Sequence, residues 1–191
     1  EPGEWVLDTK AERLYYWPEE GGRPSGVTIP LGTELVRMEG EIDYEGPRDT
    51  PVRGIELQGL TFRHGDRFPF SGLTGLGVQH DWAVFDAPTA MVRLRGAENC
   101  VVENCVFEAA GGDGLRLDLH AQLNRIEGNR IEHLGGVGVL LAGYGPGTKD
   151  VNKANRVRNN LIHHIGELYW HSPGIFLWQS GHNEIAHNHI H

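Results

Sequence analysis

The sequence predicts an all-β fold, a solenoid of stacked parallel strands, on the strength of three observations. A short pattern of polar and apolar residues recurs along the chain. Within each copy the apolar residues alternate with their neighbours, which is the period of a strand and not of a helix. Glycine is abundant, with 27 residues among 191, as a turn-rich chain requires. Because each copy is too short to bury its own apolar residues, the copies must stack on one another.

The repeat has the form Asn-x-apolar-x-x-Asn-x-apolar, and a short apolar strand precedes each of its last four copies. We therefore predict a right-handed parallel β-helix of about five rungs, a rung being one turn of the chain. The copies run over 55–62, 100–107, 124–131, 155–162 and 183–190. The strands that precede the last four are 91–94, 114–117, 138–141 and 174–177.

The recurring asparagines are expected to form an internal ladder. A buried side-chain amide at a turn can bond to the backbone and to the Asn of the next rung. Cys100 and Cys105 occupy the same positions one rung earlier. Free cysteine is among the most buried residue types, so we predict two buried thiols and no disulfide.

Residues 1–50 do not share the repeat and are expected to flank or cap the rungs of 51–191. Residues 3–18 read as two aromatic-rich strands around a polar turn, which is typical of a hairpin. Short strands are also expected at 27–29 and 34–38. The chain stops on a repeat without a cap, so further rungs are expected beyond it.

Composition excludes several classes of partner. The formal charge of −9 repels polyphosphate, and no basic run interrupts it, so nucleic acid and anionic membranes are not expected partners. No apolar run is long enough to span a membrane. The sequence predicts no cofactor, and an oligosaccharide or polysaccharide is the expected ligand. The oligomeric state stays open.

Strand alternation places a set of polar and aromatic side chains on one outer face of the solenoid. With Leu94, Leu117, Leu141 and Leu177 pointing inward, their neighbours must point outward. Sugars offer apolar ring faces to aromatic side chains and hydroxyls to polar ones, so this mixture favours a carbohydrate site. The outward set is Arg93, Arg95, Arg116, Asp118, His120, Leu140, Ala142, Tyr144, Phe176, Trp178 and Ser180.

Three insertions adjoin the same face, at 63–90, 144–153 and 166–173, and function on rigid scaffolds concentrates in such loops. Hydrolysis of a glycosidic bond needs two carboxyl groups, while a histidine can transfer a proton. The candidate catalytic residues are Asp118, Asp150, His120 and His171. The candidate substrate-binding residues are Arg116, Tyr144, Lys149, Trp170, Trp178 and Gln179.

A second outward column combines carboxylates and imidazoles, in Glu108, Glu132, His163 and His191. Such rows on a strand face are more often solvated than metal-binding, so we expect no metal site there. The remaining turn histidines, at positions 133, 164, 182 and 187, are expected to bond to backbone.

Several motifs together resemble bacterial right-handed parallel β-helix repeat proteins of the pectate-lyase-like superfamily. They are GEWVLDTKAERLYYWP, GLTFRHGDRF, ENCVVENCVF, YGPGTKDVN, YWHSPGI and WQSG. The sequence is most similar to glycoside hydrolase family 141, which includes fucosidase and xylanase activities. That resemblance implies a glycan-degrading enzyme, secreted or periplasmic, whose chain continues into further rungs.

Two alternatives remain open at this stage. A non-catalytic glycan-binding or structural solenoid, such as a surface or tail protein, would have the same fold, because fold does not fix function. A lyase or epimerase acting on uronates would need a base beside Arg, Lys or Ca²⁺; Arg93, Arg95 and Arg116 could serve, but no dense Asp cluster for calcium is evident.

Overall fold

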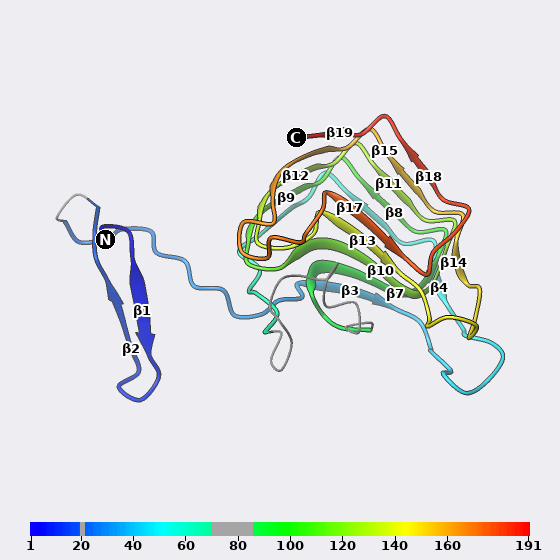
Figure 1. Cartoon of the computed structure of the whole chain (residues 1–191), viewed down its shortest axis with the longest axis horizontal. Helices are drawn as coiled ribbons and strands as arrows, with labels where there is room; N and C mark the ends of the chain where they lie inside the picture. The colour runs from blue at the N-terminus through cyan, green and yellow to red at the C-terminus, as the bar shows by residue number, and fades with distance from the viewer. Residues whose placement is uncertain (20–21, 70–85) are drawn as a thin grey trace.

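The computed structural model describes residues 1–19, 22–69 and 86–191, and in these residues the fold is all-β. Three parallel sheets form the sides of a β-helix, and a separate two-stranded sheet lies near the N-terminus (Figure 1). Five strands stack along each side, which confirms the predicted solenoid of about five rungs.

The N-terminal sheet is the predicted hairpin. Strand β1 (Trp5–Asp8) pairs antiparallel with β2 (Arg13–Tyr16). The Asp8 carboxylate closes the turn by accepting hydrogen bonds from the backbone N–H groups of Lys10 and Ala11, as Asp commonly does in turns. The strand expected at 27–29 is wrong, because that segment is irregular. Three residues of high strand propensity form a strand only where a neighbouring strand can pair with them.

The first sheet positions most of the candidate site. Its strands are parallel, and their order follows the rungs. Strand β3, from the segment expected to flank the solenoid, pairs with β7 and so belongs to this stack. The main strands are β3 (Val36–Glu39), β7 (Ala90–Glu98), β10 (Asp113–Gln122), β13 (Val139–Ala142) and β17 (Ile175–Trp178). Two short strands, β4 (Val52–Arg53) and β14 (Asn152–Lys153), pair with the ends of β7 and β10.

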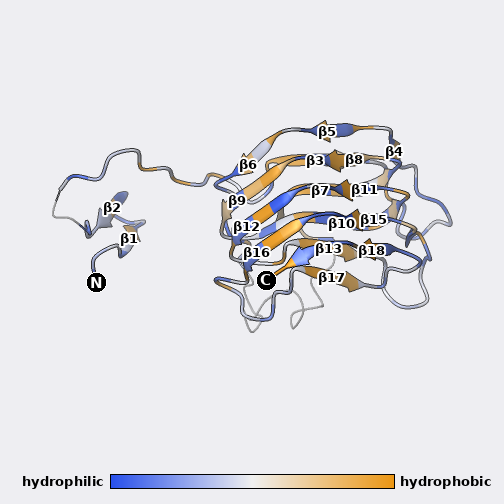
Figure 2. Ribbon diagram, turned by 90° about the horizontal axis from the view of Figure 1, so that it is seen from above, coloured by the Kyte–Doolittle hydropathy of each residue, from blue (hydrophilic) through white to orange (hydrophobic). Residues whose placement is uncertain are grey.

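The second and third sheets carry the repeat itself, and their strands stack one above another (Figure 2). The second sheet contains β5 (Glu56–Gln58), β8 (Val101–Glu103), β11 (Arg125–Glu127), β15 (Arg156–Arg158) and β18 (Glu184–Ala186). The third contains β6 (Thr61–Arg63), β9 (Val106–Ala110), β12 (Arg130–Leu134), β16 (Leu161–Ile165) and β19 (His189–Ile190).

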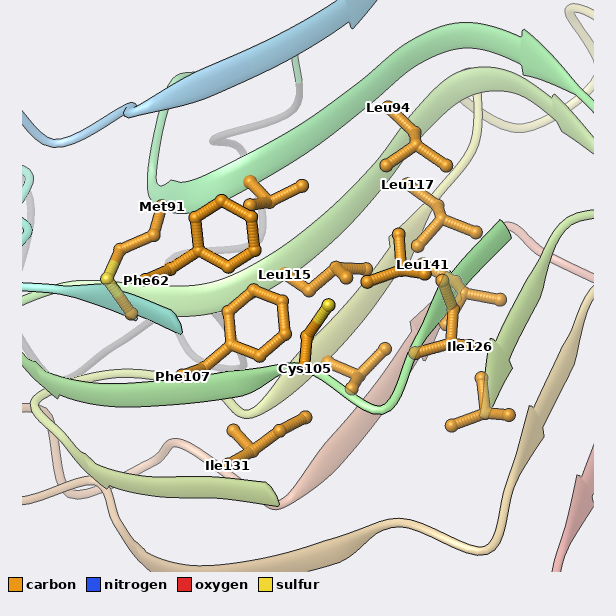
Figure 3. Packing of buried hydrophobic residues seen from close by; sticks show 14 of the residues in the cluster. Phe62, Met91, Leu94, Cys105, Phe107, Leu115, Leu117, Ile126, Ile131 and Leu141 are labelled. Atoms are coloured by element: carbon orange, nitrogen blue, oxygen red, sulfur yellow. The ribbon is translucent and has the colours of Figure 1, made fainter. Parts of the chain in front are cut away.

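The core lies inside the three sheets and is built from residues in register. Leu94, Leu117 and Leu141 occupy one row and are fully buried (Figure 3). Phe62 stacks on Phe107 with ring centroids 5.1 Å apart, a favourable aromatic geometry. The predicted inward row is therefore confirmed for these three residues. Leu177 continues the row in register, but it is 38% exposed on β17.

The amide ladder is also confirmed. The Asn124 side-chain NH₂ donates to Asn155 Oδ1 (3.0 Å) and to the Ala97 carbonyl (3.0 Å), and Asn124 Oδ1 accepts from the Cys100 N–H (2.9 Å). A second ladder of Asn129, Asn160 and Asn188 repeats these contacts at the next corner. Cys100 and Cys105 are buried free thiols, as predicted.

The corner between the first and second sheets has a regular backbone. The residue just before each first-ladder position has a positive φ, in a row formed by Asn99, Leu123, Ala154 and His182. Such left-handed residues turn the chain sharply from one sheet into the next. Strand β10 adds a bulge, since its register with β7 shifts between Asp118 and Ala121.

Candidate functional site

The outer face of the first sheet carries the side chains that the sequence predicted for it, in two rows. Arg93, Arg116, Leu140 and Phe176 align across neighbouring strands, as do Arg95, Asp118, Ala142 and Trp178. The outer face therefore carries charged side chains on β7 and β10 and apolar side chains on β13 and β17. The combination of polar and aromatic side chains predicted for this face is confirmed.

The middle of this face is buried, although the sequence led us to expect an exposed site. Arg93, Arg116 and Asp118 are each 3% exposed or less, and Leu140 and Ala142 are equally covered. Alternation along a strand shows which side of the sheet a residue faces. It does not show whether other chain segments cover that side.

Asp118 is held between two arginines. Its Oδ1 accepts from Arg116 Nε at 2.6 Å, and its Oδ2 accepts from Arg93 Nε at 2.7 Å. Arg116 also donates to Thr89 Oγ1. Both carboxylate oxygens are therefore engaged by guanidinium groups, and the side chain has no solvent-exposed surface. A carboxylate held in this way is suited to fixing the positions of the two arginines and not to contacting a saccharide.

Asp86 extends the buried charges toward the exposed edge of the face. It accepts hydrogen bonds from both Arg93 and Arg95. Burial alone would raise the pKa of Asp86, but the hydrogen bonds and charge of Arg95 and Arg93 hold that pKa below its ordinary value. Arg95 also forms an ion pair with Glu39, with 2.8 Å between Nη1 and Oε1.

Asp113 differs from the other carboxylates of this face. Burial raises its pKa to about 6, although Thr89, the Val137 N–H and Arg116 act in the opposite direction. Gly136 allows this placement, because a Cβ there would lie 2.1 Å from Asp113 Oδ1. Asp113 is therefore a buried carboxyl group whose charge is unfavourable in the folded state.

The raised pKa of Asp113 predicts a pH effect on stability. The group binds a proton more tightly when folded, so its stabilising contribution is complete below about pH 4 and is lost as pH rises through about 6. We expect Asp113→Asn, which is neutral throughout, to flatten the free energy of unfolding over that interval. Denaturant titrations of both proteins across pH 4–7 would check this. An unchanged pH profile in the variant would contradict the assignment.

A second polar cluster is centred on Asp49, which the sequence analysis did not single out. Asp49 Oδ1 accepts from the Tyr144 hydroxyl (2.8 Å), from Lys149 Nζ (3.0 Å) and from the Asp43 N–H (3.0 Å). Burial would raise the pKa of Asp49, but these three donors hold it below its ordinary value. Asp49 thus joins the 41–50 loop to the 144–150 loop. In the sequence Asp49 is marked only by lying in a stretch rich in Gly and Pro. Many surface loops have such a composition, so it did not point to this residue.

His120 faces the same cluster from the bulge in β10. The preceding residue, Leu119, has a φ of 56° and is fully buried, and such bulges redirect side chains. His120 Nε2 lies 2.7 Å from Glu98 Oε1, and its Nδ1 lies 3.4 Å from Asp49 Oδ2. Three residues that the sequence predicted for the site therefore surround the Asp49 carboxylate: His120, Tyr144 and Lys149.

A pocket of about 520 Å³ opens beside this cluster, between the 144–150 loop and the turn after β17. Four predicted residues line it, and Lys149 lies 4.8 Å from the centre of the Tyr144 ring. Asp150 is exposed, and its carboxylate pairs with Lys153 at 2.8 Å. We call this the 144–150 pocket. Its lining residues are Tyr144, Gly145, Gly147, Thr148, Lys149, Asp150, Gln179, Ser180 and Gly181.

The other predicted residues lie outside this pocket. Arg116 and Asp118 belong to the buried ion cluster. Trp178 packs on the apolar patch formed by Val137, Leu140 and Ala142. Trp170 is 80% exposed in the 166–173 loop, and His171 beside it is also exposed. Of the 63–90 insertion, residues 70–85, including His80, Asp81 and Trp82, lie outside the described residues.

The carboxylate and imidazole column on the third sheet forms as predicted. Glu108, Glu132 and His163 align in register, and His163 Nε2 lies 2.8 Å from Glu132 Oε2. His191 stacks on His163 with ring centroids 5.2 Å apart. Within residues 1–19, 22–69 and 86–191, no group of three or more such side chains is arranged to hold a metal ion.

The stacked parallel sheets and the corner ladders define a right-handed β-helix. A family model described as the right-handed beta helix region matches residues 84–190, and the chain belongs to this family. No curated protein and no solved structure matches the chain. In the part of the chain that the structure describes, no helix has the length and apolarity to cross a membrane.

Proposed function

We propose that this β-helix is a carbohydrate-active protein and that the 144–150 pocket binds a neutral saccharide. The observation that carries the proposal is the meeting of Tyr144, Lys149, Asp150 and Gln179 around one pocket. Its volume of about 520 Å³ lies within the usual range for small-ligand sites. An oligosaccharide or polysaccharide of a secreted or periplasmic environment is the partner in this proposal.

The chemistry of the lining supports a sugar. Gln179, Ser180 and Thr148 offer both donors and acceptors, which match hydroxyl groups. The charges of Asp150 and Lys149 are each compensated by a partner, Lys153 and Asp49 respectively. A pocket with many polar groups and little net charge favours a neutral polyhydroxylated ligand over an anion.

The activity we propose is hydrolysis of O-glycosyl bonds, in line with the resemblance to glycoside hydrolases. Asp150 is the exposed carboxylate of the pocket, so it is the first candidate for a catalytic role. Hydrolysis needs a second carboxyl group about 5–10 Å away. Because Asp118 is fully buried between two arginines, we give it a structural role in this proposal.

Asp150→Asn tests the proposal in a product assay with neutral plant and host oligosaccharides. We expect the rate of bond cleavage to fall by about 10²-fold or more, since a general acid or base contributes about that much. Gln179→Ala should weaken saccharide binding by up to about tenfold through the loss of hydrogen bonds. Glu108→Gln, on the third sheet, is the matched control and should change neither value. Wild-type cleavage in Asp150→Asn would exclude this carboxylate.

A glycan-binding solenoid without catalysis is the second candidate. The observation that favours it is the complete burial of Asp118 between two arginines, which keeps the best-placed strand carboxylate out of contact with a saccharide. This alternative predicts saccharide binding that depends on Gln179 and on the exposed Trp170, with no cleavage in any product assay.

A further inference from the structure

His120 lies between two carboxylates that belong to different parts of the fold. Its Nε2 is 2.7 Å from Glu98 Oε1 at the end of β7, and its Nδ1 is 3.4 Å from Asp49 Oδ2 in the 41–50 loop. The His120 side chain is 9% exposed, and the Asp49 side chain has no exposed surface. In the residues that the structure describes, neither His120 Nδ1 nor Asp49 Oδ2 has a hydrogen-bond partner. Two buried polar atoms therefore face each other without a bond between them.

The protonation state of His120 decides whether this contact is favourable. Burial would raise the pKa of Glu98, but hydrogen bonds from His120 and Arg53 hold that pKa below its ordinary value. An ionised carboxylate only accepts hydrogen bonds, so His120 Nε2 carries a proton. In a neutral imidazole the other nitrogen is then an acceptor, and it faces a second acceptor in Asp49 Oδ2. In the imidazolium both nitrogens donate, and each carboxylate receives one N–H.

Only the charged form of His120 therefore satisfies both contacts. Asp49 is ionised as well, because its hydrogen bonds hold its pKa below the ordinary value in spite of burial. A hydrogen bond between an imidazolium and a carboxylate is about twice as strong as one between neutral groups. Two buried acceptors without a donor instead cost desolvation free energy. We expect the 41–50 loop to separate from His120 when the imidazole loses its charge.

The charged groups around His120 do not replace it in this contact. The titratable groups that face it are Glu98 of β7, Arg53 of β4, Asp49 of the 41–50 loop, and Tyr144 and Lys149 of the 144–150 loop. Arg53 and Lys149 bond to the far oxygens of the two carboxylates, Glu98 Oε2 and Asp49 Oδ1. Lys153 of β14 pairs with Asp150. Among these types of group, only an imidazole ordinarily changes its charge between pH 5 and 8.

We propose that His120 is a pH-dependent latch, whose charged form holds the 41–50 loop against the first sheet and thereby orders the 144–150 loop. The latch is closed near pH 5.5 and open near pH 8. Its consequence for ligand binding rests on the proposed function of the 144–150 pocket. The movement of the 41–50 loop does not depend on that function.

Asp49 connects the latch to the pocket. Its Oδ1 accepts hydrogen bonds from the Tyr144 hydroxyl (2.8 Å) and from Lys149 Nζ (3.0 Å), and both of these residues line the pocket. The two loops extend from the same corner of the solenoid, beside β4 and β14 (Figure 1). When the 41–50 loop separates from His120, these two pocket residues lose the carboxylate that fixes their positions.

Hydrogen exchange of the 41–50 loop, measured without ligand and corrected for the intrinsic effect of pH on exchange, tests the latch. The Asp43 N–H reports directly, because it donates to Asp49 Oδ1 at 3.0 Å. We expect the amides of 41–50 to be at least about tenfold more protected at pH 5.5 than at pH 8, since a hydrogen bond to a charged group contributes that much. The ladder segment 124–131 should show no such change. Equal protection of the loop at both pH values would overturn the proposal.

Asp49→Asn should give a result that a merely structural role cannot. Its side-chain NH₂ can donate to the Nδ1 of a neutral imidazole, while its carbonyl oxygen still accepts from Tyr144. The loop should then be more protected at pH 8 than at pH 5.5, the reverse of the wild type. His120→Gln, which has no charge to lose, should show no difference. His133→Gln on the third sheet is the matched control and should keep the wild-type response. A wild-type response in H120Q or D49N would contradict the latch.

Titration with a neutral oligosaccharide at the same two pH values separates the latch from the proposed function. We expect binding to be about tenfold tighter at pH 5.5, in proportion to the closed fraction, and H120Q should lose this difference. If no saccharide binds at either pH while the loop exchange still depends on pH, the proposed function is wrong and the latch is supported. Saccharide binding together with pH-independent loop exchange would overturn the latch alone.

Discussion

Replacing Asp118 with Asn is expected to lower the free energy of unfolding by about 3–5 kcal/mol, the usual cost of removing one partner from a buried ion pair. Asp118 is fully buried, and it is paired with Arg93 and Arg116 at 2.7 and 2.6 Å. Arg116 is equally buried. The substitution leaves two guanidinium groups with less compensation inside the fold, and an amide cannot supply the missing charge.

Urea titration of Asp118→Asn beside Asp150→Asn measures this effect. Asp150 carries the same chemical group, but it is exposed and paired with Lys153, so its substitution should leave the midpoint of unfolding almost unchanged. Similar losses in the two variants would contradict the structural role of Asp118. A stable Asp118→Asn variant without activity would instead support the catalytic role that the sequence first suggested.

Asn160→Ala is expected to lower the free energy of unfolding by about 3 kcal/mol or more. Asn160 Oδ1 accepts from the backbone N–H and the side chain of Asn129, and its own side chain donates to Asn188 and to the Ile126 carbonyl. Alanine makes none of these hydrogen bonds. Each buried group left without a partner costs about 1–3 kcal/mol.

Asn188→Ala is the matched control, because the same residue type stands at the same ladder position in the last rung. Asn188 is partly exposed, so water can replace some of its bonds. We expect a loss of about 1 kcal/mol, measured by chemical or thermal unfolding. If the two substitutions cost the same, the ladder would not act through buried, mutually supporting amides.

The sequence was sufficient to predict the solenoid because its constraints are local and repeated. An inward residue at position 94 requires equivalents at 117 and 141, and the register pairs all three. The ladder followed from the spacing of Asn124, Asn155 and Asn183 alone. A polar amide is buried in a protein only when it has hydrogen-bond partners. The recurrence of Asn once per repeat therefore already indicated that the rungs stack and that their Asn side chains bond to one another.

The site was less predictable because it depends on contacts between distant segments. Tyr144 and Lys149 meet Asp49 across about a hundred residues of chain, and no local pattern specifies that meeting. Asp118 is buried with Arg93 and Arg116, and strand alternation does not reveal that burial. Strand alternation correctly placed His120, Tyr144 and Trp178 on the outer side. The long-range packing decides which of them is accessible.

The two cysteines mark a change in how neighbouring rungs are coupled. From Asn124 onward a side-chain amide links each rung to the next. The Cys100 thiol instead contacts the Glu98 carbonyl of its own rung, and the Cys105 thiol reaches the Leu57 carbonyl of the preceding rung at 3.6 Å. In a one-dimensional array, cooperativity depends on the coupling between nearest neighbours. The junction ahead of Cys100 and Cys105 has backbone pairing and a thiol contact in place of the amide ladder, so we expect weaker coupling there than between the amide-linked rungs. Fraying that starts from the N-terminal side would stop at the first amide-linked rung, which would keep the strands around the 144–150 pocket intact.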